Sequence, residues 1–436
     1  MLLIAFVHFV ASFVSPPNTI NTDSLVAAAR KNVSAYIDLN NSLTGYYSID
    51  NKGVSIYESA NSKLNNKVEC KIFWSELPAF KHLLATVSYD SLLSIFKNKG
   101  EKKFDFCVAE NKNENIIKDT LQLLKGKKIA IDPGHISGDM DLGKIEYKYL
   151  RLKKDSLKGI PSPIELIEGN LTLATALFLK EKLELQGATV MLTREKPGQS
   201  AFGISYDEWL KNANNKTFED AYDKKEISLE EKNRFIKKRN RRDIFQTYFK
   251  FADMRERALK INNFHPDLTL VVHYNVNEKN IPWTGVTPKN YCMTFVPGNI
   301  KNEFFEKPEN RLELLRLIIT NDIESSISFS SNLTASFEKI LEVPLATKKD
   351  AEYLEKESLE TKGKGVFIRN LALTRLIHGT MVYGESLYQD NEKESKLLSE
   401  LTTSINGIPT SLRVKQVADA YYDAILKYFL PIPPNK

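Results

Sequence analysis

From residue 127 onward, unbroken apolar runs alternate with segments whose apolar residues recur at helical spacing. The runs Lys127–His135, Ala188–Arg194 and Leu268–His273 predict buried strands, and the segments Glu168–Gln186 and Met254–Asn263 predict helices. Continuous apolar strands separated by helices are typical of a parallel sheet with helices on both faces. We therefore predict an α/β domain with a mainly parallel twisted sheet over residues 126–436.

The same pattern continues toward the carboxyl terminus. Tyr291–Pro297 and Thr380–Glu385 predict two more strands, and Ser411–Phe429 predicts an amphipathic closing helix that ends before two prolines. Two charge-rich stretches with helical spacing, at about residues 195–248 and 299–364, interrupt the pattern. They are too long to be simple loops of a compact domain. We interpret them as helical insertions over one end of the sheet.

The first 18 residues have the pattern of a secretory signal peptide. Leu2–Val14 is almost continuously apolar and is followed by small residues and prolines, although no Lys or Arg precedes it. The run is shorter than the roughly 20 residues that span a bilayer, so an uncleaved anchor is the weaker alternative. We expect an exported protein of the periplasm or cell envelope, with no transmembrane domain once the signal is removed.

Residues 19–122 predict a small α+β domain of unknown role. Short strand-like runs occur at Gly53–Tyr57, Val68–Trp74 and Phe104–Val108, and Ser75–Phe96 has helical spacing. Cys70 and Cys107 both fall in strand-like runs. Two interpretations stay open for them: a disulfide, which export would permit, or two thiols in the core.

The small numbers of cysteines and histidines limit the kinds of metal site that this chain can form. The 436 residues include three cysteines and six histidines, which excludes a disulfide scaffold and a four-cysteine zinc site. A 42% hydrophobic share with 27% charged residues excludes global disorder. The net charge of +6 permits an anionic partner without selecting one. Any metal site must therefore use few histidines together with carboxylates.

Two histidines lie where a site is expected. His135 and His273 each end an apolar strand run, and ligands of open α/β sheets bind at the carboxyl ends of strands. A catalytic zinc ion commonly takes three protein ligands and keeps a fourth position for water. Glu168, at the start of a helix, can supply the third ligand, and Glu146 and Glu165 compete with it at this level of argument.

Six motifs occur in a fixed order along this part of the chain. They are Ile131–His135 (IDPGH), Glu168–Lys180, Val190–Arg194 (VMLTR), Arg257–Asn262 (RxxxxN), Asp267–Asn275 (DLTLVVHYN) and Glu385–Glu394 (ESLYQDNEKE). In this order, Lys127 to about Phe429 resembles the zinc-dependent N-acetylmuramoyl-L-alanine amidases of the Amidase_3 family. That resemblance implies hydrolysis of peptidoglycan at the amide bond between N-acetylmuramic acid and the L-alanine of the stem peptide.

The resemblance also implies roles for individual residues. His135, Glu168 and His273 would hold one Zn²⁺ ion, and Glu385 would be the catalytic carboxylate. Asp132 would orient a ligand histidine or cap the turn before Pro133. Asn275 would contact substrate or brace its loop. His378 would stabilise the oxyanion or serve a structural role at a strand edge.

Departures from the family pattern leave further alternatives open. The two insertions would widen the substrate groove, dock a regulatory protein or cover the zinc site. Leu387 stands where the family has glycine, which adds bulk beside Glu385. The basic run Lys232–Arg242 predicts a solvated helix face or a contact with anionic wall polymer, and no nucleic acid is expected. The rival functions are a zinc carboxypeptidase acting on wall peptides, against which the absence of an HExxH motif argues, and a masked or regulatory wall-binding homologue.

Overall fold

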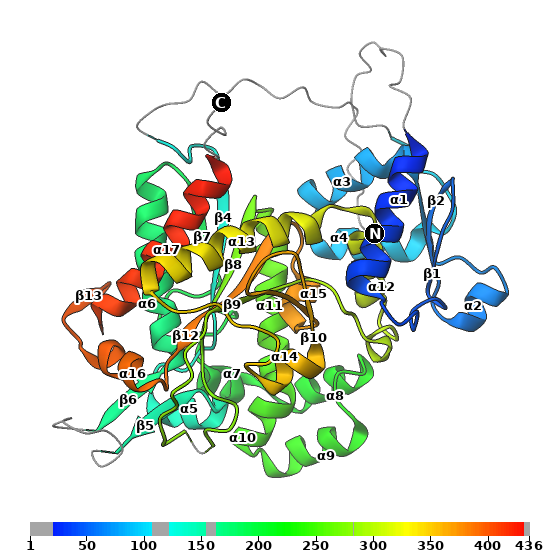
Figure 1. The fold of residues 1–436 in the computed structure, drawn as a ribbon. Coiled ribbons are helices and arrows are strands. Elements are labelled where there is room, and N and C mark those ends of the chain that lie inside the picture. The colour runs from blue at the N-terminus through cyan, green and yellow to red at the C-terminus, as the bar shows by residue number, and fades with distance from the viewer. Residues whose placement is uncertain (1–20, 107–121, 154–162, 282, 431–436) are drawn as a thin grey trace, which may run out of the picture.

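A computed structural model describes residues 21–106, 122–153, 163–281 and 283–430 (Figure 1). The predicted signal peptide lies outside these residues, as does Cys107, so the export signal and the state of the Cys70–Cys107 pair stay predictions. No helix among the described segments is long and apolar enough to cross a membrane.

A seven-stranded sheet forms the centre of the molecule, in the order β10-β11-β9-β12-β8-β4-β7. Four of its six neighbouring pairs are parallel, and the β10–β11 and β9–β12 pairs are antiparallel. The prediction of a mainly parallel sheet is confirmed. The strands are β4 (Lys128–Pro133), β7 (Thr189–Leu192), β8 (Leu268–Asn275), β9 (Met293–Val296), β10 (Ser358–Glu360), β11 (Val366–Arg369) and β12 (Met381–Tyr388).

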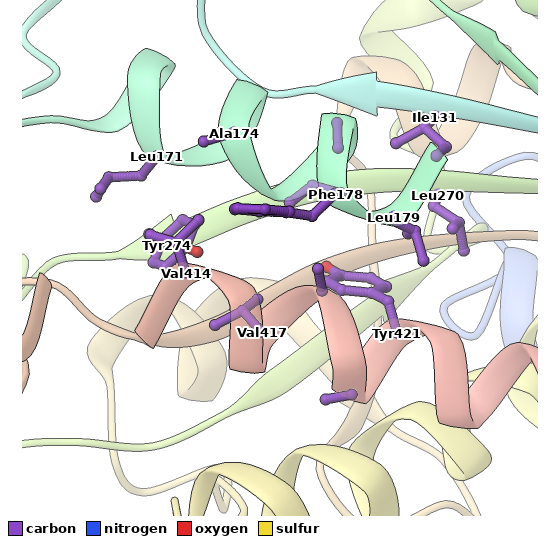
Figure 2. Close-up of a cluster of buried hydrophobic side chains, with 14 of the residues drawn as sticks. Ile131, Leu171, Ala174, Phe178, Leu179, Leu270, Tyr274, Val414, Val417 and Tyr421 are labelled. Atoms are coloured by element: carbon purple, nitrogen blue, oxygen red, sulfur yellow. The ribbon is translucent and has the colours of Figure 1, made fainter. Parts of the chain in front are cut away.

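Helices cover both faces because alternate residues of each central strand point to opposite sides. In β8, Leu268, Leu270 and Val272 join the core beneath α6 (Glu168–Leu185), α13 (Asp322–Leu341) and α17 (Leu412–Phe429). Val271 instead joins a second core beneath α11 (Lys250–Phe264) and α15 (Ala372–Leu376). Figure 2 shows α6 and α17 packed against each other, with Ile131 and Leu270 of the sheet beside them. The predicted helices α6, α11 and α17 are therefore confirmed.

The first polar stretch forms a cluster of short helices at the lower end of the molecule in Figure 1. Two of these helices start at S-x-x-E capping boxes, in which Ser205 and Ser228 accept hydrogen bonds from the amides of Glu208 and Glu231. The cluster packs on α5 (Met140–Glu146), which follows the loop after β4. Its helices are α7 (Tyr206–Asn212), α8 (Asn215–Asp223), α9 (Leu229–Lys238) and α10 (Arg241–Ile244), with a π-helical turn at Phe245–Phe249.

The second polar stretch differs from the expectation that it covers one end of the sheet. Its helix α13 lies along one face of the sheet and belongs to the main core through Phe329, Leu333 and Phe337. Its helix α12 (Pro308–Ile319) is buried on every side. Only α14 (Glu352–Glu357) remains as a short helix near the carboxyl end of β8. This stretch is polar in overall composition, but its apolar residues recur at helical spacing. They pack into the core.

The N-terminal region is α+β, as predicted, and contains a three-stranded antiparallel sheet. The single helix expected over Ser75–Phe96 is two helices, because Val87 is extended and Ser88 caps the second one. Residues 104–106 form no strand. The elements are α1 (Thr22–Asn32), β1 (Tyr47–Ile49), β2 (Gly53–Ile56), α2 (Ala60–Leu64), β3 (Cys70–Phe73), α3 (Leu77–Thr86) and α4 (Tyr89–Lys99).

This region shares its hydrophobic core with the rest of the chain. Val54 and Ile72 pack in one cluster with Leu315 of α12 and Ile368 of β11. Polar contacts reinforce the junction, since Arg311 donates to both carboxylate oxygens of Glu69 at 2.5 and 2.7 Å. The predicted boundary near residue 122 stays a prediction, and apolar packing crosses it.

Candidate metal centre and active site

Three elements bring His135, Glu168 and His273 together at the carboxyl edge of the sheet. His135 follows β4 in a left-handed backbone conformation with φ 59°, Glu168 is the first residue of α6, and His273 lies in β8. Gly134 permits this approach, because a Cβ atom there would lie 2.2 Å from the His273 ring. Within the described part of the chain, these three form the only group of three His, Cys, Asp or Glu residues spaced to hold a metal ion.

The spacing of their ligand atoms suits a small tetrahedral metal ion. Glu168 Oε1 lies 3.4 Å from His135 Nε2 and 3.0 Å from His273 Nδ1. Ligand atoms about 2.0–2.1 Å from a tetrahedral zinc ion are roughly 3.3 Å apart. His135 Nε2 is buried and has no hydrogen-bond partner among the described residues. Two imidazole nitrogens and one carboxylate oxygen therefore form a donor set that fits zinc, and one of these nitrogens has no other partner.

Glu146 fixes the orientation of His135. Its Oε1 lies 3.0 Å from His135 Nδ1, and its Oε2 accepts from the Ser137 amide at 2.9 Å. Burial alone would raise the Glu146 pKa, but His135 and the Ser137 amide outweigh it and hold the pKa at about 2. A carboxylate bound to one imidazole nitrogen directs the other toward a metal. Glu146 is thus a partner of His135 here. Glu165 instead pairs with Arg151 at 2.8 Å, on the exposed face of the two-stranded antiparallel sheet formed by β5 (Tyr149–Leu152) and β6 (Ile164–Ile167).

The two oxygens of Glu168 face different partners. Oε1 faces both histidines, whereas Oε2 lies 3.6 Å from Lys148 Nζ and 3.4 Å from Gln389 Nε2. Burial opposes ionisation of Glu168, but Lys148 and His135 hold its pKa well below the usual range. Burial lowers the His273 pKa to about 4, so this ring is neutral at pH 7, as a metal ligand must be.

Glu385 lies beside His273 because β12 runs parallel to β8 with these residues in register. Its Oε2 is buried and has no hydrogen-bond partner among the described residues. Burial and the charge of Glu168 raise the Glu385 pKa to about 7. A carboxylate with a pKa near neutrality is suited to exchanging protons during catalysis. The register shifts between Glu385 and Tyr388, and the bulky Leu387 of this irregularity is buried in the main core.

Asp132 and Asn275 lie next to the site and take part in bracing contacts. Asp132 accepts hydrogen bonds from Thr193 and Arg257, and among the described residues it has no bond to either histidine. Asn275 donates to the Tyr353 hydroxyl at 2.8 Å, and its own side-chain oxygen accepts from the Val276 amide. These contacts brace both residues, and the roles predicted for Asp132 and Asn275 stay predictions.

His378 lies away from the other site residues. It precedes the amino end of β12, whereas Glu385 lies toward the carboxyl end of that strand. Its Nε2 is 2.9 Å from Glu313 Oε1, and its backbone amide donates to Asn262. The structure does not bring His378 within reach of the three candidate ligands, and its predicted role stays a prediction.

Two neighbours of the site, Tyr353 and Lys148, carried no signal in the sequence. Tyr353 reaches Asn275 from α14 in the second polar stretch, and the ring of Tyr353 lies 4.5 Å below the Arg369 guanidinium. Lys148 comes from the segment after the first histidine, as does Glu146, which the sequence predicted only as a competing metal ligand. Their roles depend on tertiary packing, which local spacing does not reveal.

The first polar stretch supports the loop that carries His135. Ile136 packs in one apolar cluster with Tyr206, Phe245 and Phe249 of that stretch. Gln246 donates to the Ile145 carbonyl at 2.6 Å, one residue before Glu146. The stretch therefore braces both members of the His135–Glu146 pair from outside.

Several solved structures are similar to this chain at low identity. The CwlD amidase of Clostridioides difficile, solved with the GerS lipoprotein, is 18% identical, with 70% of this chain and 98% of that chain covered and a TM-score of 0.35. The Ami1 amidases of Mycobacterium abscessus and Mycobacterium smegmatis are 14% and 13% identical, with TM-scores of 0.37 and 0.39. Each match covers 70% of this chain, and 99% and 98% of those chains respectively.

A search of curated proteins finds no match. The family model described as N-acetylmuramoyl-L-alanine amidase, Amidase_3, matches residues 129–426 and so covers most of the chain. The matched range contains the three candidate ligands, Glu146 and Glu385. The chain therefore belongs to the N-acetylmuramoyl-L-alanine amidase family, as its motifs predict, and is an enzyme of peptidoglycan hydrolysis.

Proposed function

We propose that this enzyme cleaves the amide bond between N-acetylmuramic acid and the L-alanine of the stem peptide, with one zinc ion held by His135, Glu168 and His273. The observation that carries the proposal is one Glu168 oxygen that lies 3.4 and 3.0 Å from two imidazole nitrogens, next to a buried carboxylate whose pKa is about 7. When bound, zinc polarises the amide carbonyl and acidifies water.

The chain's own residues divide the remaining work. Glu146 holds His135 so that Nε2 faces the metal position. Glu385 takes the proton of the attacking water and returns it to the leaving alanine nitrogen. The C–N bond then breaks, which leaves a carboxylic acid on the muramic acid side and a free amino group on the stem peptide.

We also propose that the enzyme acts outside the cytoplasm, where peptidoglycan lies. The apolar run Leu2–Val14 supports this proposal. Detection of the mature protein in the envelope fraction, with an amino terminus near residue 19, tests it. A full-length protein confined to the cytosol would contradict it.

The proposed reaction is tested by zinc analysis and digestion of purified peptidoglycan. We expect one zinc per chain in the wild type and in Glu385→Gln, with stem peptides that begin at L-alanine released by the wild type alone. Glu165→Gln is the matched control, because it removes an exposed carboxylate near the same helix. Shortened stems still attached to glycan would favour the carboxypeptidase alternative instead.

A further inference from the structure

Lys148 is a cation at the metal position to which no role has been assigned. It follows Tyr147, which ends α5 in a left-handed conformation with φ 58°. The Lys148 amide donates to the Gly143 carbonyl, and the Lys148 carbonyl accepts from the Glu168 amide. Hydrogen bonds on both sides fix this backbone, and they tie it directly to the residue that begins α6.

The Lys148 side chain is partly exposed, unlike the carboxylate that it faces. Nζ is 3.6 Å from Glu168 Oε2, the oxygen that does not face the histidines. The Lys148 side chain is 33% exposed, whereas that of Glu168 is 1% exposed. Substrate must approach the ligands from the accessible side, where a partly exposed side chain can reach the substrate's reacting group.

Buried ion pairs that hold the fold together have a different geometry in this chain. The structural lysine Lys99 is 4% exposed, lies 3.2 and 3.3 Å from the two oxygens of Glu76, and also donates to the Lys102 carbonyl. Lys148 has a single long ion pair among the described residues. An ammonium has three donors. With respect to the described residues, Lys148 therefore keeps unused hydrogen-bonding capacity beside the metal position.

We propose that Lys148 is a catalytic residue that donates a hydrogen bond to the substrate's amide carbonyl oxygen as water adds to the carbonyl carbon. This inference rests on the proposed function. The water oxygen forms a bond to carbon, the π electron pair moves onto the carbonyl oxygen, and Lys148 stabilises that charge without giving up its proton. The charge collapses again when the C–N bond breaks and Glu385 protonates the nitrogen.

The test compares Lys148→Met with Lys144→Met, the same change at an exposed lysine of α5. On a soluble muramyl peptide we expect Lys148→Met to lower kcat about 10²–10³-fold, the usual loss for one oxyanion donor. The KM and the zinc affinity, measured by competition with a chelator, should change less than threefold. Lys148→Arg should restore part of kcat, and Lys144→Met should match the wild type.

Two results would overturn the proposal. One is a Lys148→Met enzyme that is as active as the wild type. The other is a tenfold or greater loss of zinc affinity with kcat per bound zinc unchanged, which would make Lys148 a positioning residue that acts through Glu168.

A separate binding measurement distinguishes failure of this proposal from failure of the proposed function. If the zinc-loaded wild type cuts no muramyl peptide, the proposed function fails. The affinity for acetohydroxamate, an anion that binds catalytic zinc through oxygen, then still tests whether Lys148 stabilises a charged oxygen at the site. We expect Lys148→Met to weaken it about tenfold or more, since a hydrogen bond to a charged group is lost. Equal affinity in both proteins would refute the assignment.

Discussion

The two polar stretches look alike in sequence and use their charges in opposite ways. In the first stretch, Arg241 pairs with Asp207 and Asp141 at the surface. In the second, Arg316 and Glu313 are both fully buried and lie 2.6 Å apart. The first stretch is an added layer that braces the His135 loop, and the second is part of the core that joins the N-terminal region to the sheet. Polar composition alone therefore does not distinguish an appended layer from a central one.

The largest expected effect comes from breaking the buried charge pair of the second stretch. Arg316→Met would remove the cation that neutralises the buried charge of Glu313. It would also remove the hydrogen bonds from Arg316 to Asp322 and to the Arg375 carbonyl. Removing one partner of a buried pair costs about 3–5 kcal/mol of unfolding free energy. Urea denaturation measures this. Arg241→Met in the first stretch should cost far less, and equal losses in the two variants would contradict the comparison.

The second-largest effect tests the His135–Glu146 pair, which the first stretch supports. Glu146→Gln should weaken zinc binding about 10–100-fold, because an amide orients His135 less strongly than a carboxylate does. The free energy of unfolding without metal should also fall, because the lowered Glu146 pKa means that its charge stabilises the folded protein at pH 7. Chelator competition measures the zinc affinity, with Glu165→Gln as the matched control. Unchanged zinc affinity in Glu146→Gln would show that His135 does not need this partner.

The free energy of unfolding should depend on pH through Glu324, which joins the second stretch to the N-terminal region. Glu324 of α13 accepts from Lys31 at 2.6 Å, Lys362 at 2.8 Å and Tyr36 at 2.7 Å. Burial opposes ionisation, but these partners lower the Glu324 pKa from 4.5 to about 2. A lowered folded-state pKa stabilises the protein above pH 4.5, and that stability is lost as pH falls toward 2.

Glu324→Gln should therefore reduce the unfolding free energy at pH 7 by about 1–2 kcal/mol. The difference from the wild type should shrink as pH falls from about 4.5 toward 2. Urea titrations at several pH values measure it. A difference that stays constant with pH would show that the Glu324 charge is not what stabilises this junction.

The smallest effect belongs to the surface of the first stretch. Ser228 caps α9 by accepting from the Glu231 amide at 3.2 Å. Ser228→Ala should cost about 1 kcal/mol of stability. Zinc affinity should be unaffected, since α9 lies at the outside of the brace. A loss of zinc binding measured by the same chelator competition would show that the whole layer is coupled to the site.

Sequence reasoning predicted the elements whose apolar periodicity is clear, and it failed where polar residues are buried. β4, β8 and α6 were predictable because their apolar runs and helical spacing are strong. The central position of helix α13 was hidden, because serines such as Ser326 and Ser336 are buried in it. Each is satisfied there by a hydrogen bond, from the Met381 amide to Ser326 and from Ser336 to Asp423.

The candidate ligands were predictable because each occupies a strand end or a helix start within a motif. The groups that act on them were not. The spacing of Glu146 in the sequence does not distinguish it from other carboxylates. It becomes the partner of His135 only because the chain turns after β4. Lys148 and Tyr353 reach the site through tertiary packing, and the predicted regulatory partner of the two stretches remains a prediction.

The central claim is that His135, Glu168 and His273 hold one zinc ion. Anomalous diffraction at the zinc absorption edge, from crystals grown with zinc, tests it directly. We expect one strong peak about 2.0–2.2 Å from His135 Nε2, His273 Nδ1 and a Glu168 oxygen, and no such peak in crystals of Glu168→Ala. A strong peak elsewhere, or an unchanged peak in that variant, would contradict the account.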